Sequence, residues 1–431
     1  MLASYFNYQV SSLTSYIRNY FPYFLPLLLI FSRSLADITI VLVSILFLYY
    51  SYKSIGWEWI KEKWFCFALI FSAYCMTINS VLSINPTESL AYSIFFIRWP
   101  IFAMALAFWV LNDIKSLKRF LLSMTIVLVF TIFDTWWQFF FEIDIFGFEK
   151  FRSDRLTGPF KGNPQVGVWI SKLILLLPLF LILYKKLKLQ DHKNYLTFGF
   201  FIFGTLLFLS ILITGERMAF LMMISSIFIL FVGLALEKIF SFKKILILSL
   251  FSFFGILTFA LFFPDATHYA FFSTIEKILN WRSSDYGLVW QSAYDVWMQS
   301  PFFGAGLHKY REACENLGTY GTYYLDSAGP GVCFHPHNIT LQLLSETGMI
   351  GFVIFYLMVI FLAISSLRTY FKKKLWLNFA IVFSIIFTCF LPIQSGTSFF
   401  ANKYGAIIWL LIGVMLATNR LFNKGNFFNS K

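Results

Sequence analysis

Long apolar runs recur along the whole chain, and short polar connections separate them. A helix of about 20 residues crosses a hydrocarbon core of about 30 Å, and most of these runs reach or approach that length. They lack the alternation of polar and apolar residues that marks the strands of a membrane barrel, so the pattern predicts helices. The predicted spans are residues 19–31, 35–52, 65–82, 89–111, 119–140, 166–184, 195–213, 218–236, 245–263, 340–366, 376–392 and 405–420.

Composition agrees with this pattern. Hydrophobic residues make up 59% of the 431 positions and charged residues only 13%, which excludes an ordinary soluble domain. We therefore predict an all-α integral membrane protein with about twelve transmembrane helices. Much of the formal net charge of +13 is explained by basic connections beside anionic lipid headgroups, and it does not indicate a nucleic-acid-binding protein.

Basic residues gather in alternate connections. This pattern predicts the orientation, because short cytoplasmic loops retain Lys and Arg. Both termini are then expected in the cytoplasm, and the intervening connections face outward. The basic connections carry Lys53, Lys61 and Lys63; Lys115, Lys118 and Arg119; Lys185, Lys186, Lys188 and Lys193; Lys238, Lys243 and Lys244; and Arg368 and Lys372 to Lys374.

Two outward segments are longer and more polar than the others. Residues 1–263 are expected to hold the first nine transmembrane helices, with an outer loop at 141–165. Residues 264–336 would form one large periplasmic loop, and 337–431 the last three helices and a cytoplasmic tail. Because the large loop is too small to bury a core of its own, we expect it to rest on the helix ends. Within it, apolar residues at helical spacing predict an amphipathic helix over 286–299, with Leu288, Val289, Ala293, Val296 and Trp297 on its apolar face.

Two of the five cysteines, Cys314 and Cys333, lie in the large outer loop. A compartment outside the bacterial cytoplasm is oxidising, so the two could form a disulfide. Such a bridge would stabilise the loop by about 3 kcal/mol, because it restricts the unfolded chain. Two free thiols are the alternative.

Two arginines are candidates for binding a phosphate group. Arg217 lies in a very short outer turn, Thr214 to Met218, between two long apolar runs. A guanidinium held at the membrane boundary can bind two phosphate oxygens in a fork, whereas a snorkelling side chain paired with Glu216 is the alternative. Arg282 precedes the predicted amphipathic helix and could act in the same way, although exposed loop arginines are common.

Arg98 and Lys172 lie within predicted spans, among apolar residues. An ionisable group is costly in that environment and usually faces a cavity or a partner. A binding role and an internally paired structural charge are both open for these two residues.

The segment from Phe334 to Asn338 brings His335 and His337 to the start of an apolar run. An imidazole at a membrane boundary, with Asn338 beside it, can serve as a general base near neutral pH. The two histidines could also be a metal pair. No third and fourth ligand occur at recognisable spacing, so we expect no metal, although His308, Cys314 and Cys333 keep that option formally open.

At this point the chain resembles a known family. His337-Asn338 is followed by nine residues, Gly348, two residues and Gly351. That spacing is similar to the end of the outer loop in the O-antigen ligase and polymerase superfamily of bacterial polysaccharide assembly. The resemblance covers nearly the whole chain, and its further features are the Pro301 to Gly306 turn, the outer turn that bears Arg217, the run from Arg155 to Phe160, and about twelve spans with both ends inside.

The resemblance implies a metal-independent membrane glycosyltransferase of GT-C-like fold in the bacterial inner membrane, with a periplasmic active site and no cofactor. Its donor would be a glycan linked to undecaprenyl diphosphate. His337 would be the catalytic base, and Arg217 and Arg282 would bind the diphosphate. Asn338, Glu216, Arg155, Lys161 and His335 would support them.

One departure concerns the second arginine. Family members often carry a basic residue about four positions before the Trp of the loop helix. Here that position is Tyr286, whereas Arg282 lies eight positions before Trp290. The assignment of Arg282 to diphosphate binding therefore has less support than that of Arg217.

The same resemblance leaves two activities open. A ligase joins the glycan to the lipid A-core oligosaccharide, and a polymerase joins one lipid-linked repeat unit to another. The His-Asn-Gly-Gly spacing favours the ligase, and attack opposite the diphosphate predicts an inverting transfer. Retention through a carboxylate nucleophile is less favoured, because Glu312, Glu315 and Asp326 show no pairing. A membrane transporter is the third alternative, but internal repeats typical of that class are not evident in the sequence.

Overall fold

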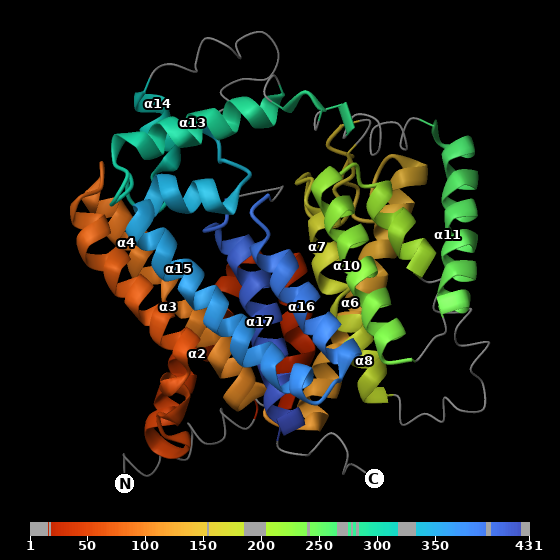
Figure 1. Cartoon of the computed structure of the whole chain (residues 1–431), viewed down its shortest axis with the longest axis horizontal. Coiled ribbons are helices and arrows are strands. Elements are labelled where there is room, and N and C mark those ends of the chain that lie inside the picture. The colour runs from red at the N-terminus through yellow and green to blue at the C-terminus, as the bar shows by residue number, and fades with distance from the viewer. Residues whose placement is uncertain are drawn as a thin grey trace.

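A computed structural model describes residues 16, 19–152, 155–184, 204–238, 242–264, 275–276, 279–281, 284–317, 333–393 and 398–423. Within these ranges the chain is all-helical, with three isolated β-bridges and no strand (Figure 1). The first helices are α2 (Arg33–Tyr50), α3 (Lys63–Tyr74), α4 (Pro86–Phe96), α5 (Arg98–Ala105), α6 (Ile114–Phe141), α7 (Val166–Leu173), α8 (Leu176–Tyr184), α10 (Arg217–Leu236) and α11 (Phe242–Phe262). The later ones are α13 (Asp285–Gln299), α14 (Tyr310–Asn316), α15 (Ile339–Lys372), α16 (Trp376–Phe390) and α17 (Asn402–Asn423).

Short π and 3-10 segments continue some of these helices. The π segments η1 (Ser51–Ile55), η3 (Cys75–Asn79) and η4 (Leu106–Val110) follow α2, α3 and α5, and the 3-10 turn η2 (Glu58–Lys61) precedes α3. A π segment changes the register of side chains around the helix axis.

Helices occupy the predicted spans wherever the structure describes them. In those parts, six helices are long and apolar enough to cross a membrane, and five shorter apolar helices accompany them. The predicted span at 195–213 is described only from residue 204 onward. The chain therefore has the helices of a membrane protein, while the count of twelve spans and the limits of the three regions stay predictions.

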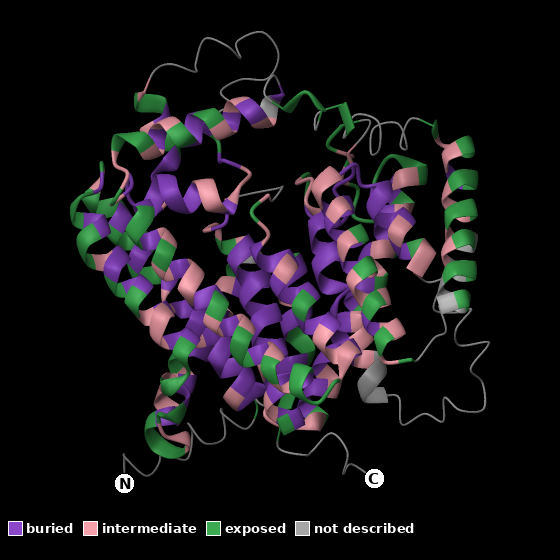
Figure 2. Ribbon diagram, viewed as in Figure 1, coloured by how far each residue is buried: buried purple, intermediate pink, exposed green. Residues whose placement is uncertain are grey.

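The core of the bundle is α17. Of the most apolar 18-residue stretch of α17, 89% is buried, against 33% for α10, so α17 is surrounded by other helices whereas α10 exposes an apolar face. Helix α17 packs against α5 and η4, and α15 packs against α3 and α16. Figure 2 shows this burial gradient, with the buried residues concentrated in the central helices.

Helices α13 and α14 lie across one end of the bundle, which we call the outer end (Figure 1). The helix predicted over 286–299 is α13, and its Val289, Ala293 and Val296 are buried as expected. Leu288 and Trp297 are only half-buried. A small core of Ala293, Val296, Ala305, Tyr310, Cys314 and Cys333 contacts Leu341 of α15, so this cap rests on the helix ends.

The cap is closed by a disulfide between Cys314 and Cys333, whose Cα atoms lie 5.5 Å apart. The indole of Trp297 donates a hydrogen bond to the Pro301 carbonyl at 3.0 Å, which fixes the end of α13 against the following turn. The disulfide and the turn hold the outer segment over the start of α15.

Candidate active site

His337 and Asn338 form the start of α15. The Asn338 side chain accepts a hydrogen bond from the Leu341 amide at 3.1 Å and so caps the helix. Asn338 also pairs through its backbone with Ile393, and the next amide, of Ile339, donates to the Pro392 carbonyl at 2.7 Å. The start of α15 is thereby fixed to the connection between α16 and α17.

The backbone of His337 adopts a left-handed conformation, with a φ of 52°. This conformation is unfavourable for a residue with a branched or bulky side chain, so the surrounding contacts must hold it. The contacts are the cap and the backbone pair just described. They fix the direction in which the His337 imidazole leaves the chain.

His335 and His337 lie against each other, with ring centroids 3.9 Å apart. His335 is only 6% exposed, and burial, together with the neighbouring His337, lowers its pKa to about 2. His335 is therefore neutral at any physiological pH. His337 is half-buried, and the edge of its ring meets Tyr286 of α13 at 5.7 Å between centroids. Of the two histidines, His337 is the one that a substrate can reach.

Gly348, the first glycine of the sequence motif, lets residues 301–308, which we call the outer turn, pack against α15. Gly348 lies inside α15 with a φ of 65° and breaks its helical geometry. A Cβ at Gly348 would lie 2.3 Å from the backbone of Phe302, so no other residue fits there. Across this break, the backbone hydrogen bonds between the turn and α15 are Ala305 N to Ser345 O, Gly306 N to Glu346 O, Met349 N to Pro301 O and Ile350 N to Phe302 O.

Two residues of the neighbouring helix bind the carbonyls at the break. The amide of Asn79 in η3 donates to Phe303 O at 2.8 Å and to Glu346 O at 2.9 Å, and Asn79 is fully buried. The Tyr74 hydroxyl donates to Thr347 O at 2.8 Å. These bonds satisfy backbone groups that a broken helix leaves without partners. Neither Asn79 nor Tyr74 was predicted from the sequence, because both lie in an apolar run without a motif.

A buried Glu346 links the outer turn to the start of α17. Its carboxylate accepts the His308 amide at 2.7 Å and the Gln342 side-chain amide at 2.9 Å. Gln342 in turn contacts the Ser398 hydroxyl at 2.5 Å and accepts the Phe399 amide at 2.9 Å. Glu346 and Gln342 were not predicted from the sequence. An acidic residue within an apolar run is the signal that could have identified Glu346.

A second group of charged residues lies at the outer ends of α7 and α10. Arg217 is the first residue of α10, and Glu216 precedes it. The Glu216 carboxylate accepts the amides of Gly167 at 2.7 Å and Val168 at 3.2 Å, so it caps the start of α7. Both carboxylate oxygens of Glu216 thus bind the start of α7, and whether Glu216 also pairs with Arg217 stays open, since each oxygen can accept a second hydrogen bond.

Glu216 is 2% exposed, and burial raises its pKa to about 7. The positive charges of Arg155 and Lys403 act in the opposite direction on this pKa. Lys403, at the start of α17, also lies 4.2 Å above the ring of Phe160. We call Arg155, Glu216, Arg217 and Lys403 the outer charge cluster. Arg155 and Arg217 were predicted from the sequence, whereas Lys403 was missed because its run carries no motif.

The connection between α16 and α17 contacts both the start of α15, beside His337, and the outer charge cluster. Ile393, after α16, pairs with Asn338 beside His337, and Lys403, at the start of α17, belongs to the outer charge cluster. Leu156 of the 141–165 loop donates its amide to the Thr214 carbonyl at 3.3 Å, which fixes that loop to the turn before Arg217. The two outer segments singled out in the sequence therefore meet at the same end of the bundle.

Lys161 and Arg282 are the remaining predicted site residues. Lys161 is exposed, at a φ of 51°, on the turn after Phe160. Arg282 lies outside the described residues. Among the residues that are described, no group of three or more His, Cys, Asp or Glu side chains is placed to hold a metal ion.

Arg98 and Lys172 are paired inside the bundle. The Arg98 guanidinium donates to Asp37 at 3.0 Å and to Asn402 at 2.9 Å. The fully buried Lys172 ammonium donates to the Thr388 carbonyl, near the end of α16, at 2.6 Å. For both residues these contacts favour the structural interpretation over a binding role, since the contacts join helices.

Residues 201–356 match the model of a protein family described as O-antigen ligase. The resemblance to the O-antigen ligase and polymerase superfamily is confirmed. The matched residues of this O-antigen ligase family include Arg217, His337, Gly348 and Gly351. No curated protein matches the chain.

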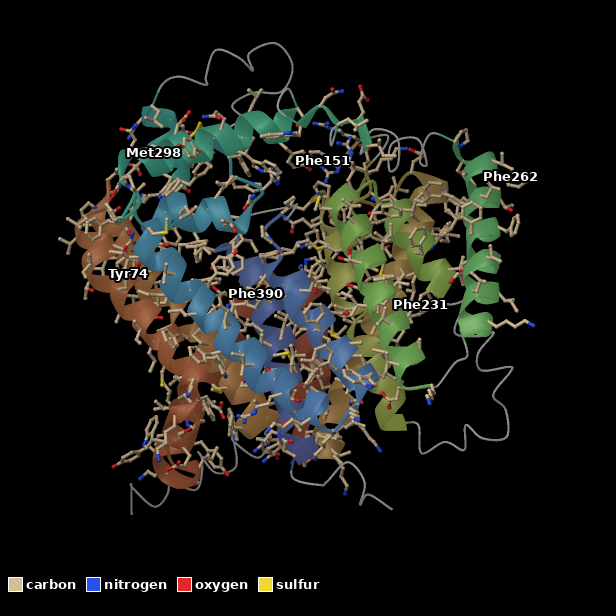
Figure 3. All side chains as sticks on the ribbon, in the orientation of Figure 1. Tyr74, Phe151, Phe231, Phe262, Met298 and Phe390 are labelled. Carbon is tan, nitrogen blue, oxygen red and sulfur yellow. A yellow bond between two sulfur atoms is a disulfide. The ribbon has the colours of Figure 1, made fainter. Side chains whose placement is uncertain are left out.

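The O-antigen ligase family suggests a membrane glycosyltransferase-like enzyme of O-antigen assembly. A function of this type implies lipid-linked polysaccharide and lipid A-core partners in general. The apolar helices agree with a membrane protein. Figure 3 draws the side chains on the bundle, with Phe390 of α16 near its middle and Met298 of α13 in the cap above.

Proposed function

We propose that this protein is an O-antigen ligase of the bacterial inner membrane. It transfers a polysaccharide from undecaprenyl diphosphate to the lipid A-core oligosaccharide at the periplasmic face. The observation that carries the proposal is the joint placement of His337 and the outer charge cluster at one end of an apolar bundle. A reachable base and cations at a membrane boundary suit a lipid-linked, doubly charged donor.

The chemistry assigns one role to each group. His337 takes the proton from the acceptor hydroxyl, and the acceptor oxygen attacks the anomeric carbon of the donor from the side opposite the diphosphate. The bond between that carbon and the phosphate oxygen breaks, and its electrons leave with the diphosphate. The transfer inverts the anomeric configuration, and the proton on His337 returns to solvent.

The leaving diphosphate gains negative charge as this bond breaks. Arg217 and Arg282 would bind it, supported by Arg155 and Lys403, because fixed cations stabilise charge that develops in the transition state. Proton transfer by a positioned base contributes about 10²- to 10⁴-fold to the rate, so this electrostatic contribution must supply much of the remainder. No metal ion has a role in these steps.

His335 supports the base. Because burial keeps His335 neutral, it places no positive charge beside His337, where the proton of the acceptor hydroxyl would be taken up. Asn338 fixes the helix start, and Glu216 positions α7 against α10. These residues position the reacting groups and do not touch the reacting atoms.

The test is a transfer assay with purified protein, an undecaprenyl-diphosphate-linked glycan and rough lipopolysaccharide, in the presence of a chelator. We expect transfer to the lipid A-core by the wild type and its loss in His337→Ala and Arg217→Ala. The anomeric configuration of the new bond, read by NMR, should be opposite to that of the donor.

Matched controls exist for both variants. His308 also has a left-handed backbone, with a φ of 63°, and its ring stacks on Tyr92 4.0 Å away, so His308→Ala has the same backbone cost as His337→Ala. Arg311 is an exposed arginine of the outer cap that pairs with Glu315, and Arg311→Ala controls for Arg217→Ala. Both controls should retain activity.

The same assay separates the alternatives. A donor that is lengthened without attachment to the core would establish the polymerase, which uses the same base and the same diphosphate site. A donor that stays unchanged in every preparation would exclude both and return the transporter to consideration. Activity that disappears with the chelator and returns with a divalent cation would contradict the metal-independent mechanism.

A further inference from the structure

A row of aromatic rings leads from the surface of the outer cap to His337. Trp281 and Trp290 have ring centroids 6.1 Å apart, Trp290 and Tyr286 6.3 Å, and Tyr286 and His337 5.7 Å. Trp281 is 46% exposed, whereas Tyr286, Trp290 and His337 are half-buried. The row therefore begins at an exposed ring and continues through partly buried rings to the proposed base.

The row is separate from the apolar face that attaches α13 to the bundle. That face consists of Val289, Ala293 and Val296, which are buried. Tyr286 and Trp290 are four residues apart on α13, so they lie one above the other beside this face. The packing of α13 onto the bundle therefore does not explain why the rings of Tyr286 and Trp290 are partly exposed.

Trp290 has a further feature that packing does not explain. Its indole nitrogen is shielded from solvent and has no hydrogen-bond partner among the described residues. A buried indole N–H usually finds an acceptor, because leaving it without one costs free energy. A hydroxyl of a bound ligand would supply the acceptor.

We propose that Trp281, Trp290 and Tyr286 form the subsite for the acceptor sugar. The apolar C–H face of a sugar ring stacks on the aromatic rings, and its rim hydroxyls remain free for hydrogen bonds such as that of Trp290. The acceptor is assigned here because the base must touch the acceptor hydroxyl, and Tyr286 touches the base. This inference rests on the proposed function.

The outer charge cluster would hold the diphosphate of the donor, and it belongs to other elements than the aromatic row. The outer charge cluster, which suits a diphosphate, is carried by the ends of α7, α10 and α17 and by the 141–165 loop. The aromatic row is carried by α13 and the residues just before it. A charged donor group and an uncharged sugar surface would thus approach the reacting centre from different elements.

The test compares Trp281→Ala with Trp57→Ala. Trp57 is 43% exposed and its ring lies 5.8 Å from that of Trp59 at an angle of 39°, which matches the 39° between Trp281 and Trp290. The acceptor is varied at saturating donor, and the donor at saturating acceptor. For Trp281→Ala we expect the KM for the acceptor to rise about 5- to 10-fold, as loss of one aromatic contact predicts. Its KM for the donor and its kcat should change less than about twofold, and Trp281→Tyr should restore the acceptor KM.

Binding of deacylated core oligosaccharide, followed by tryptophan fluorescence, provides a readout that does not depend on turnover. We expect saturable quenching in the wild type and in Trp57→Ala and its loss in Trp281→Ala. If the wild type transfers glycan but Trp281→Ala keeps the acceptor KM, or raises the donor KM instead, the subsite is wrong and the ligase stands. If the wild type transfers nothing, the ligase proposal fails, and the fluorescence result alone decides the sugar subsite. Quenching that is equal in all three proteins overturns the subsite.

Discussion

His335 and His337 lie with their ring centroids 3.9 Å apart, and only His337 is open to a substrate. The buried partner cannot take up a proton, because its pKa is lowered to about 2. His335 therefore adds no positive charge beside His337. The lowered pKa of His335 also makes the stability of the protein depend on pH.

The first prediction concerns acid stability. The pKa of His335 is lower in the folded protein than its ordinary value of 6.5, so below pH 6.5 the unfolded chain binds a proton that the folded chain does not. The contribution of His335 to stability is therefore complete above pH 6.5 and decreases as the pH falls. Between pH 7.5 and pH 5 we expect the wild type to lose about 2 kcal/mol from this source. Thermal unfolding in detergent at the two pH values, compared with His335→Phe, measures it; an equal loss in the variant would assign the effect to other groups.

A second prediction concerns Gly348. Gly348→Ala should destabilise the protein by about 3 kcal/mol or more, because the new methyl group meets the backbone of Phe302 and the φ of 65° is strained for alanine. The control is Gly255→Ala in α11, where the nearest atom lies at an ordinary 3.5 Å, and this variant should be neutral or slightly more stable. Melting temperatures of both variants check the prediction. A Gly348→Ala protein that melts with the wild type would show that the turn does not need this close approach.

The third prediction concerns Glu346. Glu346→Gln replaces an acceptor oxygen by a donor where the carboxylate receives the His308 amide and the Gln342 side chain. A buried group left without a partner costs about 1–3 kcal/mol, so the outer turn should open more often. Hydrogen exchange of the 306–310 amides should increase. Glu315→Gln, which disrupts only an exposed pair with Arg311, should leave that exchange unchanged.

A fourth prediction links the outer charge cluster to pH. Burial raises the pKa of Glu216 to about 7, so this group is largely neutral below pH 7 and ionised above it. Its negative charge offsets the cations that would bind the diphosphate, and one such interaction screened by water is worth about 1 kcal/mol. We expect the KM for the donor to rise about three- to fivefold between pH 6 and pH 8 in the wild type. In Glu216→Gln the rise should be absent. A rise of the same size in the variant would place the titrating group elsewhere.

Individual elements show how much of the fold can be predicted from the sequence. The apolar runs located α10 and α11 to within a few residues, since spanning length and hydrophobicity are local properties. The spacing of apolar residues also located α13 and its buried Val289, Ala293 and Val296. The sequence left open whether Cys314 and Cys333 form a disulfide, and in the structure they do.

The roles of single polar residues were harder to predict. Arg98 and Lys172 stood out as costly charges, but their partners Asp37 and Thr388 lie on other helices, so the sequence left binding and pairing open. Asn79 did not stand out at all. Its bond to Phe303 joins positions 224 residues apart, and no local pattern records such a contact.

The sequence alone therefore determined a helical membrane protein, the positions of its long apolar helices where the structure describes them, and the motif of His337, Asn338, Gly348 and Gly351 that the family match supports. Tertiary structure decided what the motif does physically: Gly348 admits the outer turn, and Glu346 and Asn79 bind it. It also decided that Lys403 joins Arg155 around Glu216. The reason is that hydrophobic periodicity is written in neighbouring residues, whereas hydrogen bonds and charge clusters depend on which distant segments the packing of the bundle brings together.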